Sequence, residues 1–391
     1  MNIAFLTSDD PFDRRAWSGI LHYMFHALNR HCDSVVSLGP AAQFWQLVAR
    51  CGARAAAMLL HMRIDPLHLA TLSRIQARIF ESRLAKTKPD IIFAPAGSTP
   101  VAHLNTKLPV VYYGDLTARL FRGYAANLTA LSNWSLSQME LIEEKALSRA
   151  NHLVYASDWA AESAAAHYGI SKEKISVIPM GANIDELPSF DEIVSLRGAG
   201  TKRYCKLLFL GVDWHRKGGD IALAALRELR SRGISASLTV VGCSPPSGIS
   251  DPDLYVIPFL DKSVPQQRQR LRELLVSSDF MLFPTRSEAF GIVCCEANAF
   301  GLPLIACKVG GVPVWNEENG IALDPGAPAS AYADAVYSLV LDPEHYRRLA
   351  LSSRKMFDER LNWDEWGRSM ARIFKRVLKE YGSCGKRMSG P

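Results

Sequence analysis

The sequence predicts an α/β protein of two doubly wound parallel sheets, as in Rossmann-like domains. Short apolar runs typical of buried strands alternate with helical patterns along the chain, which is the order found in parallel α/β folds. The chain has 391 residues, too many for one ordinary core, so we expect two domains. Apolar residues make up 48% and charged residues 21%, as in a soluble globular protein.

The first domain is expected to be Rossmann-like and to cover residues 1–187. Its predicted strands are the apolar runs at 3–7, 34–38, 90–94, 109–113, 152–156 and 175–179. Gly19 opens the helical stretch after the first of these strands. A small residue there would let a phosphate approach the backbone at the helix start, although a simple turn glycine is an equal alternative.

A polar, glycine-bearing stretch at 188–202 is expected to link the domains. The second Rossmann-like domain then covers 203–361, with predicted strands at 206–210, 237–241, 254–257, 280–283, 303–306 and 321–323. A last helix, at about 364–381, is expected to pack back across the domains and join the first. In such sheets ligands lie beyond the carboxyl ends of the strands, so a central cleft between the domains is the expected site.

Two glutamates follow the apolar run at 280–283. Glu288 is delivered to a loop by the strand end, and Glu296 comes eight positions later, about two helical turns or roughly 12 Å if that interval is helical. The backbone N–H groups of Phe290–Ile292 lie at a helix start, where they lack intrahelical partners. Such glutamates often mark only a solvated helix face, but here the interval is almost wholly apolar. Carboxylates beside an anion-binding helix start suit a nucleotide sugar.

Two further strand ends carry groups suited to phosphate. Arg216 and Lys217 supply a planar fork and a point charge, both fitted to a diphosphate, or else they form a solvated basic turn. Gly310 and Gly311, with Pro313 behind them, predict a helix start open to an anion, or a structural turn.

The first domain offers a carboxylate at a comparable position. Asp115 follows the fourth predicted strand, and we expect it to face the cleft. It would orient a sugar hydroxyl, act as a base, or cap the next helix. Asn183 or Asp185 would line the same cleft or cap a turn.

Charge is concentrated in one segment. Between Ala41 and Lys88 there are eight basic and two acidic residues, a net charge of +6, equal to that of the whole chain. An apolar helical stretch, with Phe44 and Trp45, begins this segment. A cationic, partly apolar surface can lie on anionic lipid headgroups; the alternative is an ordinary solvated helix face.

Other classes of function have little support in the sequence. The eight cysteines include no CxxC pair and the histidines have no metal-ligand spacing, so we expect no metal and a reduced, cytoplasmic compartment. The cations of the basic segment are not interleaved with surface aromatic residues, as they would be in a nucleic-acid site. No apolar run reaches the roughly 18 residues that span a membrane, and we expect any membrane contact to be peripheral, at the inner face.

These residues resemble the family 4 retaining glycosyltransferases of the GT-B fold. The main match is Glu288-x7-Glu296 within the stretch 287–296. Weaker matches lie at 177–181, 216–218 and 310–313, and a bacterial branch of the family is similar at 13–19, 155–160 and 168–169. The resemblance therefore covers nearly the whole chain.

The resemblance implies a role for each matching residue. Glu288 would hold the donor-sugar hydroxyls and Glu296 the ribose hydroxyls, while Arg216 and Lys217 would neutralise the diphosphate without a metal or other cofactor. The residues implied to contact the donor through their backbone are Gly19, Phe290, Gly291, Ile292, Gly310 and Gly311. A retaining, front-face reaction would need no enzyme nucleophile, so catalysis would rest on positioning and electrostatics.

Two positions depart from the family pattern. Asp115 stands where many members have a histidine, and Val212 stands where many have an arginine in the phosphate loop.

From the resemblance as a whole we expect a hexosyltransferase that uses a nucleoside-diphosphate sugar and a lipid-linked, polysaccharide or other glycan acceptor. The alternatives are a non-catalytic nucleotide-sugar or glycan-binding protein of the same fold, and a phosphorylase or sugar-phosphate synthase.

Overall fold

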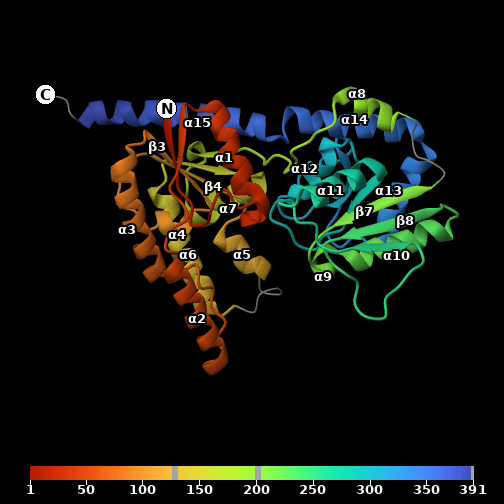
Figure 1. Cartoon of the computed structure of the whole chain (residues 1–391), viewed down its shortest axis with the longest axis horizontal. Coiled ribbons are helices and arrows are strands. Elements are labelled where there is room, and N and C mark those ends of the chain that lie inside the picture. The colour runs from red at the N-terminus through yellow and green to blue at the C-terminus, as the bar shows by residue number, and fades with distance from the viewer. Residues whose placement is uncertain (126–130, 199–203, 389–391) are drawn as a thin grey trace. The chain divides into compact units, whose positions relative to one another are not determined.

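The computed structural model describes residues 1–125, 131–198 and 204–388. The chain divides into two compact units, Met1–Pro179 with Trp366–Pro391, and Met180–Glu365. Each unit holds one six-stranded sheet (Figure 1), and all neighbouring strands in both sheets are parallel. The predicted α/β class with two parallel sheets is confirmed.

The sheet of the first unit has the order β2-β1-β3-β4-β5-β6. Its strands are β1 (Asn2–Phe5), β2 (Ser34–Ser37), β3 (Ile91–Pro95), β4 (Val110–Gly114), β5 (His152–Tyr155) and β6 (Ile175–Val177). Every predicted strand of this half is present. The inner strands β1, β3, β4 and β5 are almost wholly buried, as expected for parallel strands covered on both faces, whereas the edge strands β2 and β6 are only partly buried.

The helices of the first unit separate these strands along the chain. They are α1 (Ile20–His31), α2 (Gln43–Leu59), α3 (Ala70–Thr87), α4 (Ser98–Val101), α5 (Ala118–Ala125), α6 (Asn133–Arg149), α7 (Asp158–Tyr168) and most of α15 (Trp363–Met388). Trp366 and Phe374 of α15 make edge contacts with Phe93 of β3, at centroid distances of 5.9 and 5.6 Å. The last helix is thus part of the core of the first unit.

The sheet of the second unit has the order β12-β11-β10-β7-β8-β9. Its strands are β7 (Cys205–Leu210), β8 (Ala236–Val241), β9 (Leu254–Ile257), β10 (Phe280–Phe283), β11 (Leu304–Cys307) and β12 (Gly320–Leu323). Its helices are α8 (Phe190–Arg197), α9 (Trp214–Lys217), α10 (Gly219–Ser231), α11 (Pro265–Ser277), α12 (Ile292–Ala299), α13 (Ala329–Leu341) and α14 (Pro343–Glu359). The chain leaves β7 toward β8 on one side and returns to β10 on the other, so the topological switch point lies between β7 and β10.

The stretch predicted to be a polar linker contains a packed helix. Ser189 and Glu192 form a capping box at the start of α8. Ile193 and Arg197 are buried, and the Arg197 guanidinium donates to the carbonyl oxygens of Leu275, Ser278 and Phe300 at 2.9, 2.5 and 3.2 Å. Polar composition hid this helix because one of its main packing groups is an arginine that satisfies backbone acceptors. The rest of the expected linker, from residue 199, lies outside the described residues.

A helix that crosses a bilayer needs about 20 consecutive, mainly apolar residues. Among the described residues, no helix is both long enough and apolar enough to cross a bilayer.

Replacing Arg197 tests whether α8 stabilises the second unit. Arg197→Ala should lower the free energy of unfolding by about 3 kcal/mol, because it leaves buried carbonyl groups without donors. Arg347→Ala, at an exposed side chain of α14, is the control and should change stability by less than about 0.5 kcal/mol. Equal urea midpoints for the two variants would contradict a packing role for α8.

Candidate functional site

Two loops meet at the switch point of the second unit. The Arg216 guanidinium donates to the Ser287 carbonyl at 3.0 Å, and the Arg286 backbone N–H donates to the Arg216 carbonyl at 2.9 Å. Gly218 has φ 79°, and a Cβ atom at this position would overlap the Pro284 carbonyl. Glycine is therefore required here, and the loops after β7 and β10 hold each other in place.

A buried ion pair lies between these loops. Lys217 Nζ donates to Glu288 Oε2, and the two side chains are only 11% and 14% exposed. The ammonium also lies 5.1 Å from the centre of the Phe283 ring. Burial and the neighbouring Arg216 lower the pKa of Lys217, whereas contact with the carboxylate favours its charged form. The structure thus brings together three residues that the sequence singled out.

The helix beside this pair, α12, begins later in the chain than the sequence predicts. Gly291 is the N-cap of α12 with φ 85°, and the helix covers only Ile292–Ala299. The interval from Glu288 to Glu296 is therefore not two full helical turns, because the chain turns through the left-handed glycine first. Phe290, which is buried, and Gly291 still bring the first N–H groups of α12 to the strand end, where no intrahelical acceptor exists.

Glu296 lies inside the unit rather than on a solvated helix face. Its side chain is fully buried; Oε1 pairs with Lys262 Nζ, and the carboxylate accepts from the Asn183 backbone N–H. Oε2 has no hydrogen-bond partner among the described residues. Burial raises the pKa of Glu296, and Lys262 opposes that shift. An unpaired buried acceptor of this kind suits a ligand hydroxyl.

Lys262 is a site residue that the sequence analysis missed. It follows β9 in a polar stretch, 34 residues before Glu296, and no motif marks it. With Asn183 it also lines an open pocket bounded by α11, in which Asp185 pairs with Arg268 at 3.5 Å. Asn183 and Asp185, whose roles the sequence left open, thus lie beside the partner of Glu296.

The glycine loop after β11 joins the same end of the sheet, but no helix starts there. Gly310 has φ 60°, and the Gly311 backbone N–H donates to the Ala289 carbonyl at 3.0 Å. The Asn319 side chain donates to the Pro313 carbonyl at 2.9 Å, and the chain runs on to β12. The predicted helix start after these glycines is wrong, because the loop is held by bonds to neighbouring loops instead.

In the first unit, Asp115 lies at the end of β4 and accepts a hydrogen bond from the Trp17 side chain. Desolvation raises the pKa of Asp115 to about 6. Trp17, Ser18 and Gly19 have φ values of 45°, 57° and 87°, and left-handed backbone at the two non-glycine residues costs of order 1 kcal/mol each. Strained backbone beside a desolvated carboxyl group is typical of a functional site.

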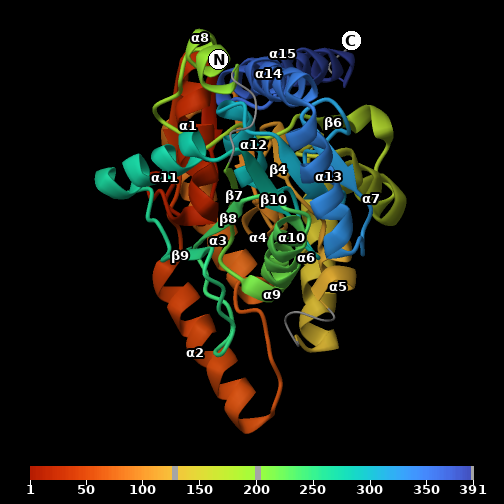
Figure 2. The same cartoon turned by 90° about the vertical axis from the view of Figure 1, so that its right-hand side faces the viewer.

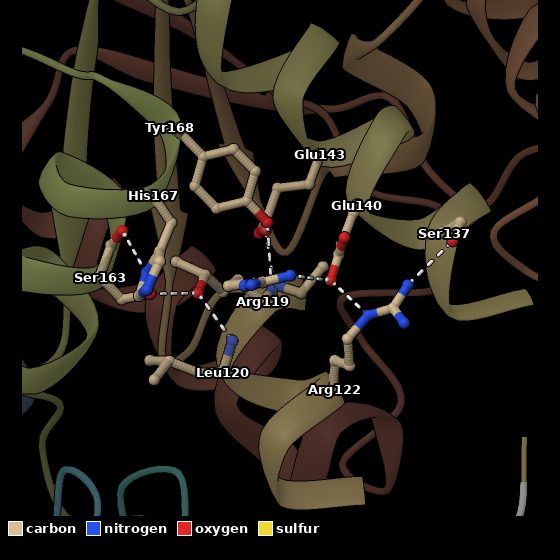
Figure 3. A network of polar contacts seen from close by, with 11 residues as sticks. Arg119, Leu120, Arg122, Ser137, Glu140, Glu143, Ser163, His167 and Tyr168 are labelled. Carbon is tan, nitrogen blue, oxygen red and sulfur yellow. Dashed lines mark hydrogen bonds and ion pairs between the residues drawn. The ribbon is translucent and has the colours of Figure 1, made fainter. Parts of the chain in front are cut away.

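A buried glutamate fixes the helix that starts three residues after Asp115. Glu143 of α6 accepts hydrogen bonds from the Ala118 N–H at 2.5 Å and the Tyr168 hydroxyl at 2.6 Å (Figure 3). The Glu143 side chain is buried, and desolvation raises its pKa to about 7. This role could not be predicted from the sequence, since Glu143 lies in a helix rich in polar residues.

Further contacts in Figure 3 hold α5 to its neighbours. Glu140 pairs with Arg122 at 2.6 Å and with Arg119 at 3.5 Å. On the other side, the Thr117 hydroxyl lies 2.7 Å from the Ser163 hydroxyl. The segment that carries Asp115 is thereby fixed by both α6 and α7.

Comparison with known proteins places both halves of the chain in related families. Residues 205–342 match the family described as Glycosyl transferases group 1, and residues 35–186 match Glycosyltransferase Family 4. A D-inositol 3-phosphate glycosyltransferase of Rhodococcus opacus is 28% identical over 281 residues, which are 66% of this chain and 62% of that relative. A Corynebacterium glutamicum protein of the same name is 33% identical over 46% of each chain.

Solved structures share the fold over almost the whole chain. Sucrose-phosphate synthase from Thermosynechococcus elongatus has a TM-score of 0.67 at 18% identity, covering 97% of this chain and 99% of that one. Anabaena Alr3699/HepE in complex with UDP and glucose has a TM-score of 0.64 at 17% identity, covering 96% and 100%. At this level of identity the likeness establishes the two-domain GT-B fold.

The chain belongs to glycosyltransferase family 4 and has the GT-B fold. The match to the Rhodococcus opacus relative spans 62% of that protein's length, less than two thirds.

The pKa of Glu143 makes stability depend on pH. Its pKa rises from 4.5 to about 7 on folding, so the folded state binds a proton more readily, and stability falls as pH rises between these values. The change corresponds to roughly 3 kcal/mol. Glu143→Gln should remove most of this pH dependence, measured as urea unfolding between pH 5 and pH 8.

The adjacent exposed residue provides the matched control. Glu144→Gln removes the same charge on the same helix without touching the network, and this variant should retain the pH dependence of the unmodified protein. An unchanged pH slope in Glu143→Gln would contradict the assignment.

Proposed function

We propose that this protein is a hexosyltransferase that moves a sugar from a nucleoside-diphosphate donor to a lipid-linked, polysaccharide or other glycan acceptor. The observation that carries the proposal is the Lys217–Glu288 pair beside Arg216 at the switch point of the second unit. It offers two cations and a carboxylate at the strand ends where α/β proteins bind nucleotides. Family membership supports the same reaction class.

The diphosphate would be bound by cations and backbone groups. Arg216 presents a planar guanidinium held by the Ser287 carbonyl, and Lys217 supplies a point charge. The start of α12 at Gly291 adds N–H groups and the positive end of the helix dipole. We propose that these groups stabilise the leaving nucleoside diphosphate without a divalent metal.

The two glutamates would hold hydroxyls at different parts of the donor. Glu296 has an unpaired buried oxygen, Oε2, suited to a ribose hydroxyl. Glu288 lies closer to the cations and would hold the sugar hydroxyls, for which it must exchange its contact with Lys217. Since the cations take up the leaving charge, front-face attack with retention needs no nucleophile from the protein, and positioning supplies most of the catalysis.

Asp115 would serve the acceptor. A carboxyl group with a pKa of about 6, held by Trp17, is mainly ionised at neutral pH and can accept a hydrogen bond from an acceptor hydroxyl. Such a group orients the hydroxyl and attracts its proton while the hydroxyl oxygen forms the new glycosidic bond. The neighbouring Gly19 lets the loop adopt its left-handed turn.

The comparisons set the order in which donors and acceptors are to be tested. The solved Anabaena structures hold UDP, glucose or UDP-glucose, and the similar enzymes from Rhodococcus are named for an inositol 3-phosphate acceptor. UDP-sugars are therefore the first donors to test, followed by GDP- and ADP-sugars, with phosphorylated polyols and lipid-linked glycans as acceptors.

The decisive variant removes the charge of Glu288 and keeps its shape. Glu288→Gln should lower kcat/KM for transfer by about 100- to 1,000-fold, the usual effect of losing one preorganised electrostatic contact. Glu273→Gln, whose side chain is 50% exposed on α11, is the charge-matched control and should retain full activity. Full activity in Glu288→Gln would refute the proposed site.

The same assay tests metal independence and the non-catalytic alternative. Transfer should persist in excess EDTA, and complete loss that Mg²⁺ restores would refute a diphosphate site built from cations alone. Donor binding with neither transfer nor donor hydrolysis would favour a binding protein instead. Asp115 and the exposed Val212, the two departures from the family pattern, are the features that point to that alternative.

A further inference from the structure

Very little of the surface of helix α2, in the first unit, packs against other elements. Of its residues Gln43–Leu59, all of which the structure describes, only Gln46 is buried. The Gln46 amide donates to the Ala41 carbonyl at 3.0 Å and to the Ser8 carbonyl at 3.4 Å, so α2 is anchored at its N-terminal end. Its far end extends beyond the other helices of this unit in Figures 1 and 2.

Large apolar side chains gather on this helix and just after it. The exposed ones are Phe44, Trp45, Leu47, Val48, Met58, Leu59 and Leu60. Met58 and Leu59 are 74% and 78% exposed, close to the exposure of an unfolded chain. Single apolar residues on a protein surface are common, but so dense a group marks an interaction surface.

Five of the six exposed apolar residues within α2 share one side of the helix, and Trp45 lies about 100° from Phe44. At about 100° per residue, Val48, Met58 and Leu59 lie within about 60° of Phe44, whereas buried Gln46 lies about 160° away. Arg50 and Arg54 fall between these two sides, about 120° and 80° from Phe44. An exposed apolar side with arginines along one edge is an order found in helices that lie in the plane of a membrane interface.

The charge of the segment selects the kind of surface it fits. No acidic residue occurs between Asp33 and Asp65, while Arg50, Arg54 and Arg63 all lie in that interval. Each cation near an anionic bilayer contributes about 1 kcal/mol to binding. A second copy of the same helix would instead place like charges against one another across a two-fold interface.

We propose that the surface formed by α2 and residues 60–63, here called the α2 surface, docks the protein on a bilayer rich in anionic phospholipid. The apolar side chains would enter the headgroup region, and the arginines would contact lipid phosphates. The proposed membrane contact thus covers only part of the basic segment 41–88 that the sequence predicted. Arg83, for example, is already engaged with the carbonyl groups of Leu38 and Pro40.

Vesicle co-sedimentation of the full chain tests the proposal. The protein should pellet with phosphatidylcholine vesicles that contain phosphatidylglycerol, bind weakly to phosphatidylcholine alone, and be released as salt shortens the screening length. The triple variant Arg50→Gln, Arg54→Gln, Arg63→Gln should bind roughly 100-fold more weakly, from about 1 kcal/mol per charge. A second variant, Met58→Ser, Leu59→Ser, Leu60→Ser, should bind weakly even at low salt.

The control removes the same charge from the neighbouring helix. Arg74→Gln, Arg78→Gln, Lys86→Gln replaces three exposed cations of α3 and should bind within a few-fold of the unmodified protein. All variants should keep its unfolding temperature, since the altered side chains are mostly solvated. Turnover with a soluble acceptor should also be unchanged, which separates this proposal from that for the donor site.

Three results would overturn the proposal. One is an equal loss of binding in the α2 and α3 variants, which would indicate attraction by overall charge. Another is binding that needs neither anionic lipid nor low salt. The third is absence of vesicle binding together with a dimer, seen by sedimentation, that the Met58, Leu59, Leu60 variant abolishes; the α2 surface would then bind a second copy.

Discussion

The contact between Lys217 and Glu288 is the interaction on which the site of the second unit depends. It joins the loops after β7 and β10, the neighbouring strands at the topological switch point of the sheet. Removing two opposite charges from water costs free energy, and their mutual attraction offsets that cost only when their geometry is close to ideal. That geometry is provided by the close approach of Gly218 to Pro284 and by the bond from Arg216 to Ser287. The fold thus holds a charged pair at the strand ends where we propose that the nucleoside diphosphate binds.

The sequence predicted the sheets and this part of the site for the same physical reason. Buried parallel strands are short and almost wholly apolar, as in Phe280–Phe283, so their ends can be located, and polar residues directly after them must lie at one edge of the sheet. Glu288, Arg216 and Lys217 were found in this way. Lys262 and Glu143 were not, because each meets its partner across many residues of sequence and no local pattern marks a buried charge. The helix Phe190–Arg197 was mistaken for a linker because polar composition does not reveal an arginine that packs against backbone carbonyls.

The first unit combines a desolvated carboxyl group with an unusually exposed helix. Asp115 accepts a hydrogen bond from Trp17, which lies on a strained loop. The start of α5, three residues after Asp115, is fixed by Glu143. The α2 surface leaves its apolar side in solvent, although burying each large apolar side chain would gain about 2 kcal/mol. A protein that leaves such a gain unrealised within itself can realise it on another surface. An acceptor carried by a lipid would then be presented to the unit that bears Asp115.

The affinity of a nucleoside diphosphate and of its sugar conjugate, measured by calorimetry on the same variants, tests the central assignment most directly. Lys217→Met should weaken both ligands by a similar factor, because both carry the diphosphate, whereas Glu288→Gln should weaken only the conjugate, because only it carries the sugar hydroxyls. Unchanged affinity of the nucleoside diphosphate for Lys217→Met would contradict the account, and so would an equal loss of both ligands in Glu288→Gln.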